Sequence, residues 1–118
     1  MSVIVVYITC KNIPEAKKIG FALVKKRLAA CSVVIPGATS FYWWPPRAGK
    51  IAQRREAILL VKTIRKNLTR IEHEMKKLHS YTVPCILAIT TAKAQRPYLK
   101  WLKGKLKAAQ ARGQLHNG

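Results

Sequence analysis

Two long strand-like segments constrain the fold of this 118-residue chain more than any other feature. Residues 31–44 and 51–63 are largely apolar or alternate with the period of a strand, and each is about twice the usual five or six residues. The clearest turn signal in the sequence lies between them, at 45–49 (Pro-Pro-Arg-Ala-Gly). The pattern therefore predicts a long β-hairpin, with a bend or bulge in its first strand at Pro36-Gly37.

The remaining segments place this hairpin in an α+β domain. An apolar, β-branched strand is expected at 3–9, and an amphipathic helix follows from an Asn12 cap to about residue 29. A second amphipathic helix is expected at 66–78, a short buried strand at 85–90, and a last helix from residue 97. This order predicts a ferredoxin-like βαββαβ fold with an additional C-terminal helix. The long strands leave edges that invite pairing with other subunits.

The length of the chain fits a single domain, which we expect at 1–112, followed by a flexible tail at 113–118. No apolar run approaches the roughly 20 residues that span a bilayer, so we expect no membrane span. The first residues lack the charged region of a signal peptide, which favours a cytoplasmic location.

Charge is the unusual feature of the composition. The chain has 23 lysines and arginines against four acidic residues, all of them glutamate, and a formal net charge of +19. Such a surface attracts polyanions, so nucleic acid and acidic proteins are expected as nonspecific partners. The alternation of aromatic residues and glycines that marks an RNA-reading sheet is absent, which argues against a module that recognises base sequence.

Several short motifs, spread over residues 3–103 in a consistent order, resemble the CutA divalent-cation tolerance family. The resemblance implies a very stable homotrimer built by intersubunit strand pairing. It also implies divalent-cation or copper binding, a role in metal tolerance, and no catalytic activity. The residues that carry it are Leu28-Ala29-Ala30-Cys31, Ile35 to Ser40, Tyr42-Trp43-Trp44, Lys62-Thr63, His79 to Pro84 and Tyr98-Leu99-Lys100-Trp101.

The chain also departs from the family pattern. The segment after Trp44 is basic where family members are acidic, and Cys85 replaces the acidic residue that usually follows Val-Pro. This loss of carboxylates favours an alternative, in which the chain is an engineered, positively supercharged CutA-derived trimeric scaffold for assembly with anionic partners.

His79 and Cys85 are the candidate metal ligands. His79 lies at the family's motif position, and imidazole is a common ligand of copper and zinc. The alternative is a histidine that is merely hydrogen-bonded. Cys85 would supply a soft thiolate for Cu(I), or else is a small buried side chain. The other cysteines, Cys10 and Cys31, are expected to be reduced thiols and are weaker candidates.

Lys62, Tyr81 and Trp44 correspond to positions that line a cleft between subunits in the family. The resemblance implies that they would hold a small anion or metal complex, although an interface role fits Trp44 equally well. With four glutamates and no aspartate, a cage for Mg²⁺ or Ca²⁺ is not expected. No nucleophile–base set or glycine-rich phosphate loop is evident, so we expect a binding protein and not an enzyme.

Overall fold

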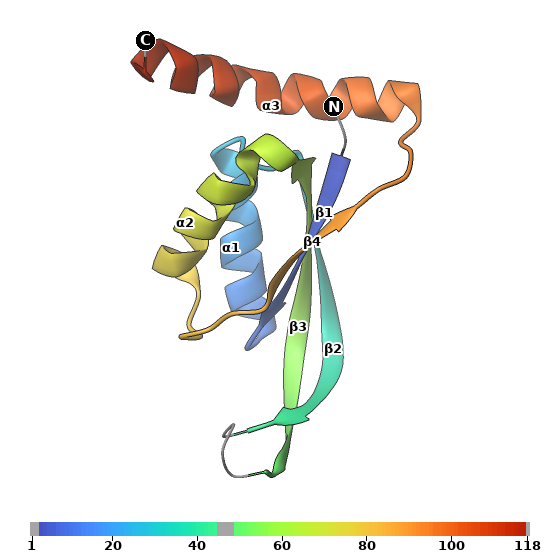
Figure 1. Ribbon diagram of the computed structural model, residues 1–118, viewed down its shortest axis with the longest axis vertical. Helices are drawn as coiled ribbons and strands as arrows, with labels where there is room; N and C mark the ends of the chain where they lie inside the picture. Colours follow the sequence, from blue (N-terminus) through green and yellow to red (C-terminus); the bar gives the residue numbers. More distant parts are fainter. Residues whose placement is uncertain (1–2, 45–48, 118) are drawn as a thin grey trace.

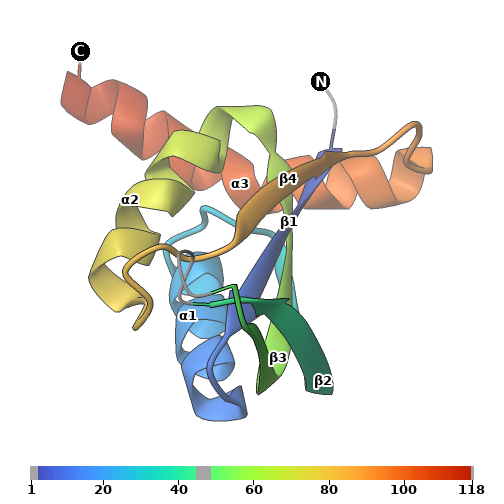
Figure 2. The ribbon, with the colours of Figure 1, turned by 60° about the horizontal axis from the view of Figure 1, so that its bottom comes forward.

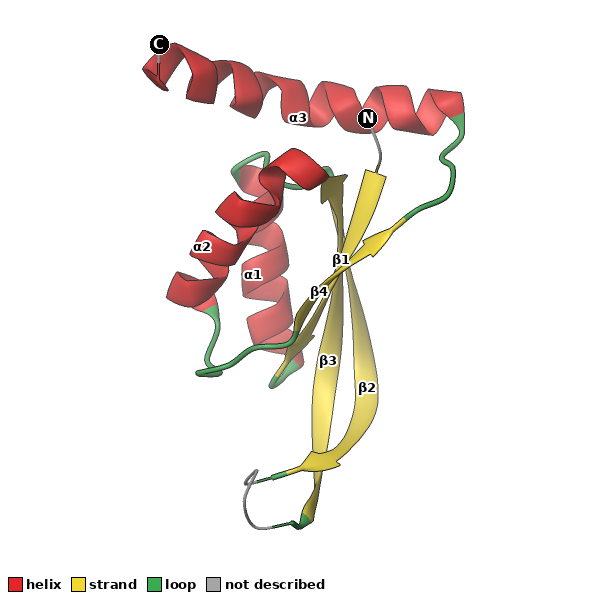
Figure 3. Ribbon diagram, in the orientation of Figure 1, coloured by secondary structure: helices red, strands yellow, loops and turns green. Residues whose placement is uncertain are grey.

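The computed structural model describes residues 3–44 and 49–117, and the side chains of these residues as far as 106. Figure 1 shows the ribbon, and Figure 3 shows the helices and strands in the same orientation. The elements in chain order are β1 (Val3–Cys10), α1 (Ile13–Lys25), β2 (Cys31–Trp43), β3 (Ile51–Ile64), the 3-10 turn η1 (Arg65–Asn67), α2 (Leu68–Leu78), β4 (Ile86–Thr90) and α3 (Arg96–Asn117).

The described strands form one antiparallel sheet in the order β2-β3-β1-β4. The helices α1 and α2 lie on the same side of this sheet and form a layer over one face (Figure 2). The order confirms the α+β class and the ferredoxin-like βαββαβ arrangement with an additional C-terminal helix.

The core lies between the sheet and the two-helix layer. Alternate residues of β1, namely Ile4, Val6 and Ile8, are buried because the side chains of a strand point to opposite faces in turn. The apolar stripes of α1 and α2 pack against them, and each large side chain buried in this way contributes about 1.5–3 kcal/mol. The remaining core residues of these elements are Leu59 and Val61 of β3, Ile19 and Leu23 of α1, and Ile71 and Met75 of α2.

The opposite face of the sheet, which we call the open face, remains exposed within the described part of the chain. It carries apolar side chains of the edge strands, with 56% of Leu87 and 48% of Ile89 accessible on β4. Val33 and Ile35 of β2 are exposed on the same face, since they pair with Leu60 and Ile58 in the register of β3.

The β2–β3 hairpin extends well beyond the helices, as Figure 1 shows. Its register shifts between Ile35 and Ala38, and Gly37 has a positive φ of 78°. This confirms the bulge predicted at Pro36-Gly37, where glycine accepts a conformation that other residues avoid. The turn predicted at 45–49 falls mostly on residues 45–48, which lie outside the described residues.

The first helix ends earlier than the sequence indicated, at Lys25 and not near residue 29. Arg27 adopts a positive φ of 58°, which stops the helix. The backbone then turns into β2, and two buried side chains of the β3–α2 segment hold it there. Thr63 Oγ1 and Asn67 Nδ2 both donate to the carbonyl of Leu28, at 2.6 and 3.1 Å.

The last helix, α3, crosses the end of the sheet where β1 begins and β3 ends (Figure 1). Leu102 and Leu106 are fully buried there against Val3 and Ile64. The helix continues to Asn117 and so includes residues 113–117 of the tail expected at 113–118. Residue 118 lies outside the described residues, and the mobility of this tail stays a prediction. Among the described helices, none combines the length and apolarity that a membrane span needs.

Candidate functional site

His79 follows α2, and its imidazole is fully buried, with 0% of the side chain exposed. Its Nε2 lies 2.7 Å from the carbonyl oxygen of Thr9, at the end of β1. Its Nδ1 accepts a hydrogen bond from the backbone N–H of Tyr81 at 3.0 Å. Since Nδ1 accepts and the Thr9 carbonyl can only accept, the ring is the neutral tautomer with its proton on Nε2.

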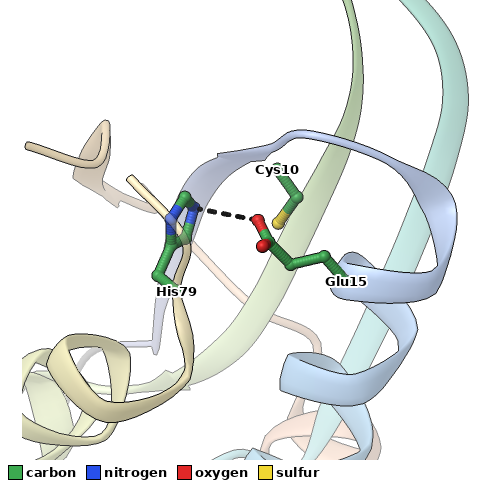
Figure 4. A group of neighbouring side chains, drawn as sticks. All are labelled: Cys10, Glu15 and His79. Atoms are coloured by element: carbon green, nitrogen blue, oxygen red, sulfur yellow. Dashed lines mark ion pairs between the residues drawn. The ribbon is translucent and has the colours of Figure 1, made fainter. Parts of the chain in front are cut away.

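Glu15 lies beside this ring at the start of α1, where the Asn12 side chain caps the helix by accepting from the Glu15 N–H at 2.9 Å. Its carboxylate accepts from the backbone N–H groups of Lys11 at 3.2 Å and Ser80 at 3.3 Å. One oxygen lies 3.7 Å from His79 Nε2, the contact drawn as a dashed line in Figure 4. Burial raises the pKa of Glu15, but the hydrogen bonds from Ser80 and Lys11 outweigh it, so the pKa lies below its ordinary value of 4.5.

Cys10, the last residue of β1, completes a cluster of three side chains (Figure 4). Its Sγ, a carboxylate oxygen of Glu15 and a ring nitrogen of His79 all lie within 4.8 Å of one another. Burial raises the pKa of the Cys10 thiol to about 12, with further contributions from the carboxylates of Glu15 and Glu56. The thiol therefore stays protonated at neutral pH.

These three side chains are of types that bind copper and zinc, yet their arrangement does not fit a resident divalent cation. A ligating imidazole needs a free lone pair, whereas Nε2 of His79 carries its proton toward Thr9 and Nδ1 already accepts from Tyr81. The Cys10 thiol would have to lose its proton to a bound cation, and burial opposes this loss. The contacts of His79 and Glu15 instead join the segment 79–81 to β1 and α1, and we call this set of hydrogen bonds the His79 latch.

The second predicted ligand, Cys85, is not part of this cluster. Among the described residues, the donor atoms that come together are those of Cys10, Glu15 and His79. Burial raises the pKa of Cys85, and the nearby Glu56 adds to the shift, so a thiolate is disfavoured there too. The sequence alone named His79 as a ligand and Cys10 as a weaker candidate, and it did not place Glu15 beside them; their roles as ligands stay predictions. The signal for Glu15 was present, because five residues separate it from Cys10 across a strand–helix corner.

Lys62, Tyr81 and Trp44 lie in different surroundings within one chain. Lys62 is on the open face of β3, where its Nζ lies 5.5 Å from the ring centroid of Tyr98 on α3. Trp44 follows β2 near the far end of the hairpin and is 58% exposed. A cleft that unites these residues between subunits stays a prediction.

Tyr81 lies beside the His79 latch, and its hydroxyl donates to the carboxylate of Glu56 at 2.7 Å. Burial and this hydrogen bond raise the pKa of Tyr81 to about 12. The guanidinium of Arg54 lies 5.2 Å from the ring centroid, within the range of a cation–π contact. Tyr81 thus connects the loop before β4 to the hairpin strand β3.

A hollow of about 480 Å³ opens at the start of α1, where the bulge of β2 faces it. Its lining includes Lys11, Arg55 and Glu56 together with Pro36 and Gly37. Cys10, Glu15 and His79 do not line it, so the hollow and the buried cluster are separate features of this region.

Comparison with known proteins decides the family. Residues 4–105 match the family model described as CutA1 divalent ion tolerance protein. The chain belongs to the CutA1 family. This confirms the resemblance found in the sequence motifs, and the family is named for tolerance of divalent ions and not for a reaction.

CutA1 relatives match most of the chain. It is 42% identical over 84% of its length to the divalent-cation tolerance protein CutA of Thermus thermophilus, of which it covers 93%. It is 38% identical over 82% of its length to the protein of the same name from Archaeoglobus fulgidus, of which it covers 91%. The crystal structure of CutA1 from Oryza sativa superposes with a TM-score of 0.84 at 33% identity, over 89% of this chain and 94% of that one.

Proposed function

We propose that this protein acts in the response to and tolerance of divalent cations, copper among them, as a homotrimer. The observation that carries the proposal is the match to the CutA1 divalent ion tolerance family over residues 4–105. Two relatives that it covers almost completely bear the name of divalent-cation tolerance proteins.

The open face of the sheet supports the association of subunits. It exposes Leu87 and Ile89 on β4 and Val33 and Ile35 on β2, and large exposed apolar patches on soluble proteins mark interaction sites. β2 and β4 are also the edge strands of the described sheet, so each presents backbone groups that another chain can pair with. The exposed Phe41, Trp43 and Ile51 of the hairpin add aromatic and apolar area beyond the body of one chain.

Light scattering after size-exclusion chromatography tests the assembly. We expect a mass three times the 13.3 kDa of one chain. A monomer at micromolar concentration would contradict the trimer, whereas the family membership would stand.

Calorimetric titration with Cu²⁺ and Zn²⁺ tests the cation-binding part of the function. We expect the assembled wild-type protein to bind one of the two, and an absence of binding would contradict this part of the proposal. His79→Ala and Cys85→Ala are the matched variants, because these residues are the ligands that the sequence predicts. If a variant binds the cation as tightly as the wild type, its substituted residue is not a ligand, and the proposed function still stands.

Two finer expectations stay predictions beside this function. The cytoplasmic location rests on the sequence alone, and so does the alternative role of an engineered scaffold for anionic partners.

A further inference from the structure

The outer faces of α1 and α2 carry a set of exposed cations that we call the helix-layer surface. On α1, Lys17, Lys18 and Lys25 lie opposite the buried stripe of Ala16, Ile19 and Leu23. On α2 and the turn before it, Lys66, Arg70 and Lys77 recur at helical spacing opposite Ile71 and Met75. The two helices lie side by side (Figure 2), so these cations form one face of the molecule.

Most of these cations have no carboxylate partner within the described side chains. Glu74 pairs with Lys26 at 2.6 Å, between the helices, and lies 3.8 Å from Lys77. None of the recorded ion pairs involves Lys17, Lys18, Lys25, Lys66 or Arg70. Elsewhere, Arg54 lies over Tyr81, Lys62 lies over Tyr98, and Arg27 donates to the carbonyl of Lys105. The helix-layer surface therefore gathers cations that are available to an external anion.

Phe21 lies in the middle of the lysines of α1 and is 69% exposed. Lys17 precedes it by four residues, Lys18 by three, and Lys25 follows it by four, so all three neighbour the ring on the helix surface. An aromatic ring in water between lysines contributes little to the core. It is the combination by which proteins stack an unpaired base and neutralise the adjoining phosphates.

The side chains on the outward face of α1 also argue against a lipid partner. A helix that lies in a membrane surface buries a whole apolar face, whereas α1 exposes Phe21 at 69% and only parts of Ile13 and Val24, at 40% and 37%, among its lysines. The helix-layer surface is also on the side of the sheet away from the open face. Subunit association through the open face would therefore leave it accessible.

We propose that the helix-layer surface binds single-stranded nucleic acid, with its cations on the phosphates and Phe21 stacked on an unpaired base. The binding is independent of base sequence, because phosphates and the π-face of a base are common to all nucleotides.

Fluorescence anisotropy with a labelled oligothymidylate, on the order of 20 nucleotides long, tests the surface in the full chain. One variant combines Lys17→Gln, Lys18→Gln and Lys25→Gln, and its matched control combines Lys93→Gln, Arg96→Gln and Lys105→Gln, exposed positions on α3 and the loop before it. Both lose three positive charges, so they have the same net charge. We expect the slope of log K against log salt to fall by about 2 in the first variant and to stay near wild type in the control. A salt slope that falls equally in both variants, or falls in neither, would overturn the proposal.

Phe21→Ala tests the stacking step, with Phe21→Trp as the conservative variant. We expect Phe21→Ala to weaken oligothymidylate binding about tenfold without changing the salt slope, and Phe21→Trp to retain it. Binding of a duplex of equal length should change little, because its bases are already stacked. An affinity that falls equally for duplex and single strand, or does not fall at all, contradicts stacking.

Vesicles of phosphatidylserine test the lipid alternative. Tighter binding to these vesicles than to the oligonucleotide, at equal phosphate concentration, would overturn the proposal in favour of a lipid partner. Circular dichroism confirms that each variant is folded.

Discussion

At the scale of single residues, His79 and Glu15 account for the position of the segment that leads into β4. The segment has no regular structure of its own between α2 and Ile86, and its backbone needs partners for its polar groups. The His79 latch supplies them, since the ring satisfies the Tyr81 N–H and the Glu15 carboxylate satisfies the Ser80 N–H. His79 and Glu15, whose side chains can bind metals in other settings, therefore serve here to hold this segment by hydrogen bonds.

The first prediction concerns His79→Ala. The change leaves the partly buried Thr9 carbonyl and Tyr81 N–H without their partner, so we expect the free energy of unfolding to fall by about 1–3 kcal/mol. Urea denaturation measures the loss. His73→Ala, on the exposed side of α2, is the matched control and should change the free energy by less than about 0.5 kcal/mol. Equal effects at both histidines would show that the latch contributes nothing to stability.

The second prediction concerns pH. Because the folded protein lowers the pKa of Glu15, the ionised carboxylate stabilises the fold above pH 4.5, and this contribution is lost as the pH falls through the lowered value. We expect Glu15→Gln to be less stable than wild type at pH 7 and the gap to close under acid conditions. Urea midpoints measured from pH 7 to pH 3 provide the test, with the exposed Glu72→Gln as the control. A gap that is the same at every pH would exclude an ionised Glu15 as its cause.

At the scale of elements, the distance between α1 and the sheet depends on Gly20. This residue lies on the buried stripe of α1, and Ser32 Oγ donates to its carbonyl at 3.0 Å. A Cβ at this position would lie 3.0 Å from Leu59 Cδ1 and 3.1 Å from Ser32 Cβ, which is closer than ordinary contact. The missing side chain thus lets the helix approach β2 and β3.

The third prediction compares Gly20→Ala with Gly104→Ala. We expect Gly20→Ala to lower the free energy of unfolding by about 1–3 kcal/mol, because crowding outweighs the better helix propensity of alanine. Gly104 of α3 has nothing within 4 Å of its added Cβ, so the same change there should raise stability by up to about 1 kcal/mol. Thermal or urea denaturation distinguishes the two signs. A stabilising Gly20→Ala would mean that α1 can move away from the sheet at little cost.

At the scale of the whole molecule, the two faces differ in chemistry. The helix layer is covered with cations, whereas the open face of the sheet carries exposed apolar side chains on its edge strands. A body with principal extents of 49 × 31 × 24 Å, elongated by its hairpin, has much surface for its mass. We therefore expect subunits to meet through the open face and the hairpin and to leave the helix layer in water.

The fourth prediction follows from this division. Leu87→Lys combined with Ile89→Lys places two charges on the open face, and we expect it to reduce the measured mass from trimer to monomer. Phe21→Lys is the control, since it replaces an even more exposed apolar side chain on the helix layer by a charge, and it should leave the mass unchanged. Light scattering of the purified variants gives the answer. Dissociation by Phe21→Lys instead would place the interface on the helix layer.

The order of the elements, the bulge at Pro36-Gly37 and the family could all be predicted from the sequence. These depend on local periodicity, on the conformational freedom of glycine and on motifs that can be recognised along the chain. The ends of the helices were less certain. The termination of α1 depends on contacts from Thr63 and Asn67, which lie 35 and 39 residues from Leu28.

The contacts of the candidate site residues depend on the tertiary fold and could not be predicted from the sequence. Thr9 and His79 are 70 residues apart, and no local pattern shows that the carbonyl of one meets the ring of the other. The same holds for Glu15 and Ser80, 65 residues apart, and for the distance between Cys85 and the cluster of Cys10, Glu15 and His79. Sequence identifies which chemistry a side chain offers. The packing of β1, α1 and the end of α2 decides whether its lone pairs and protons are already in use.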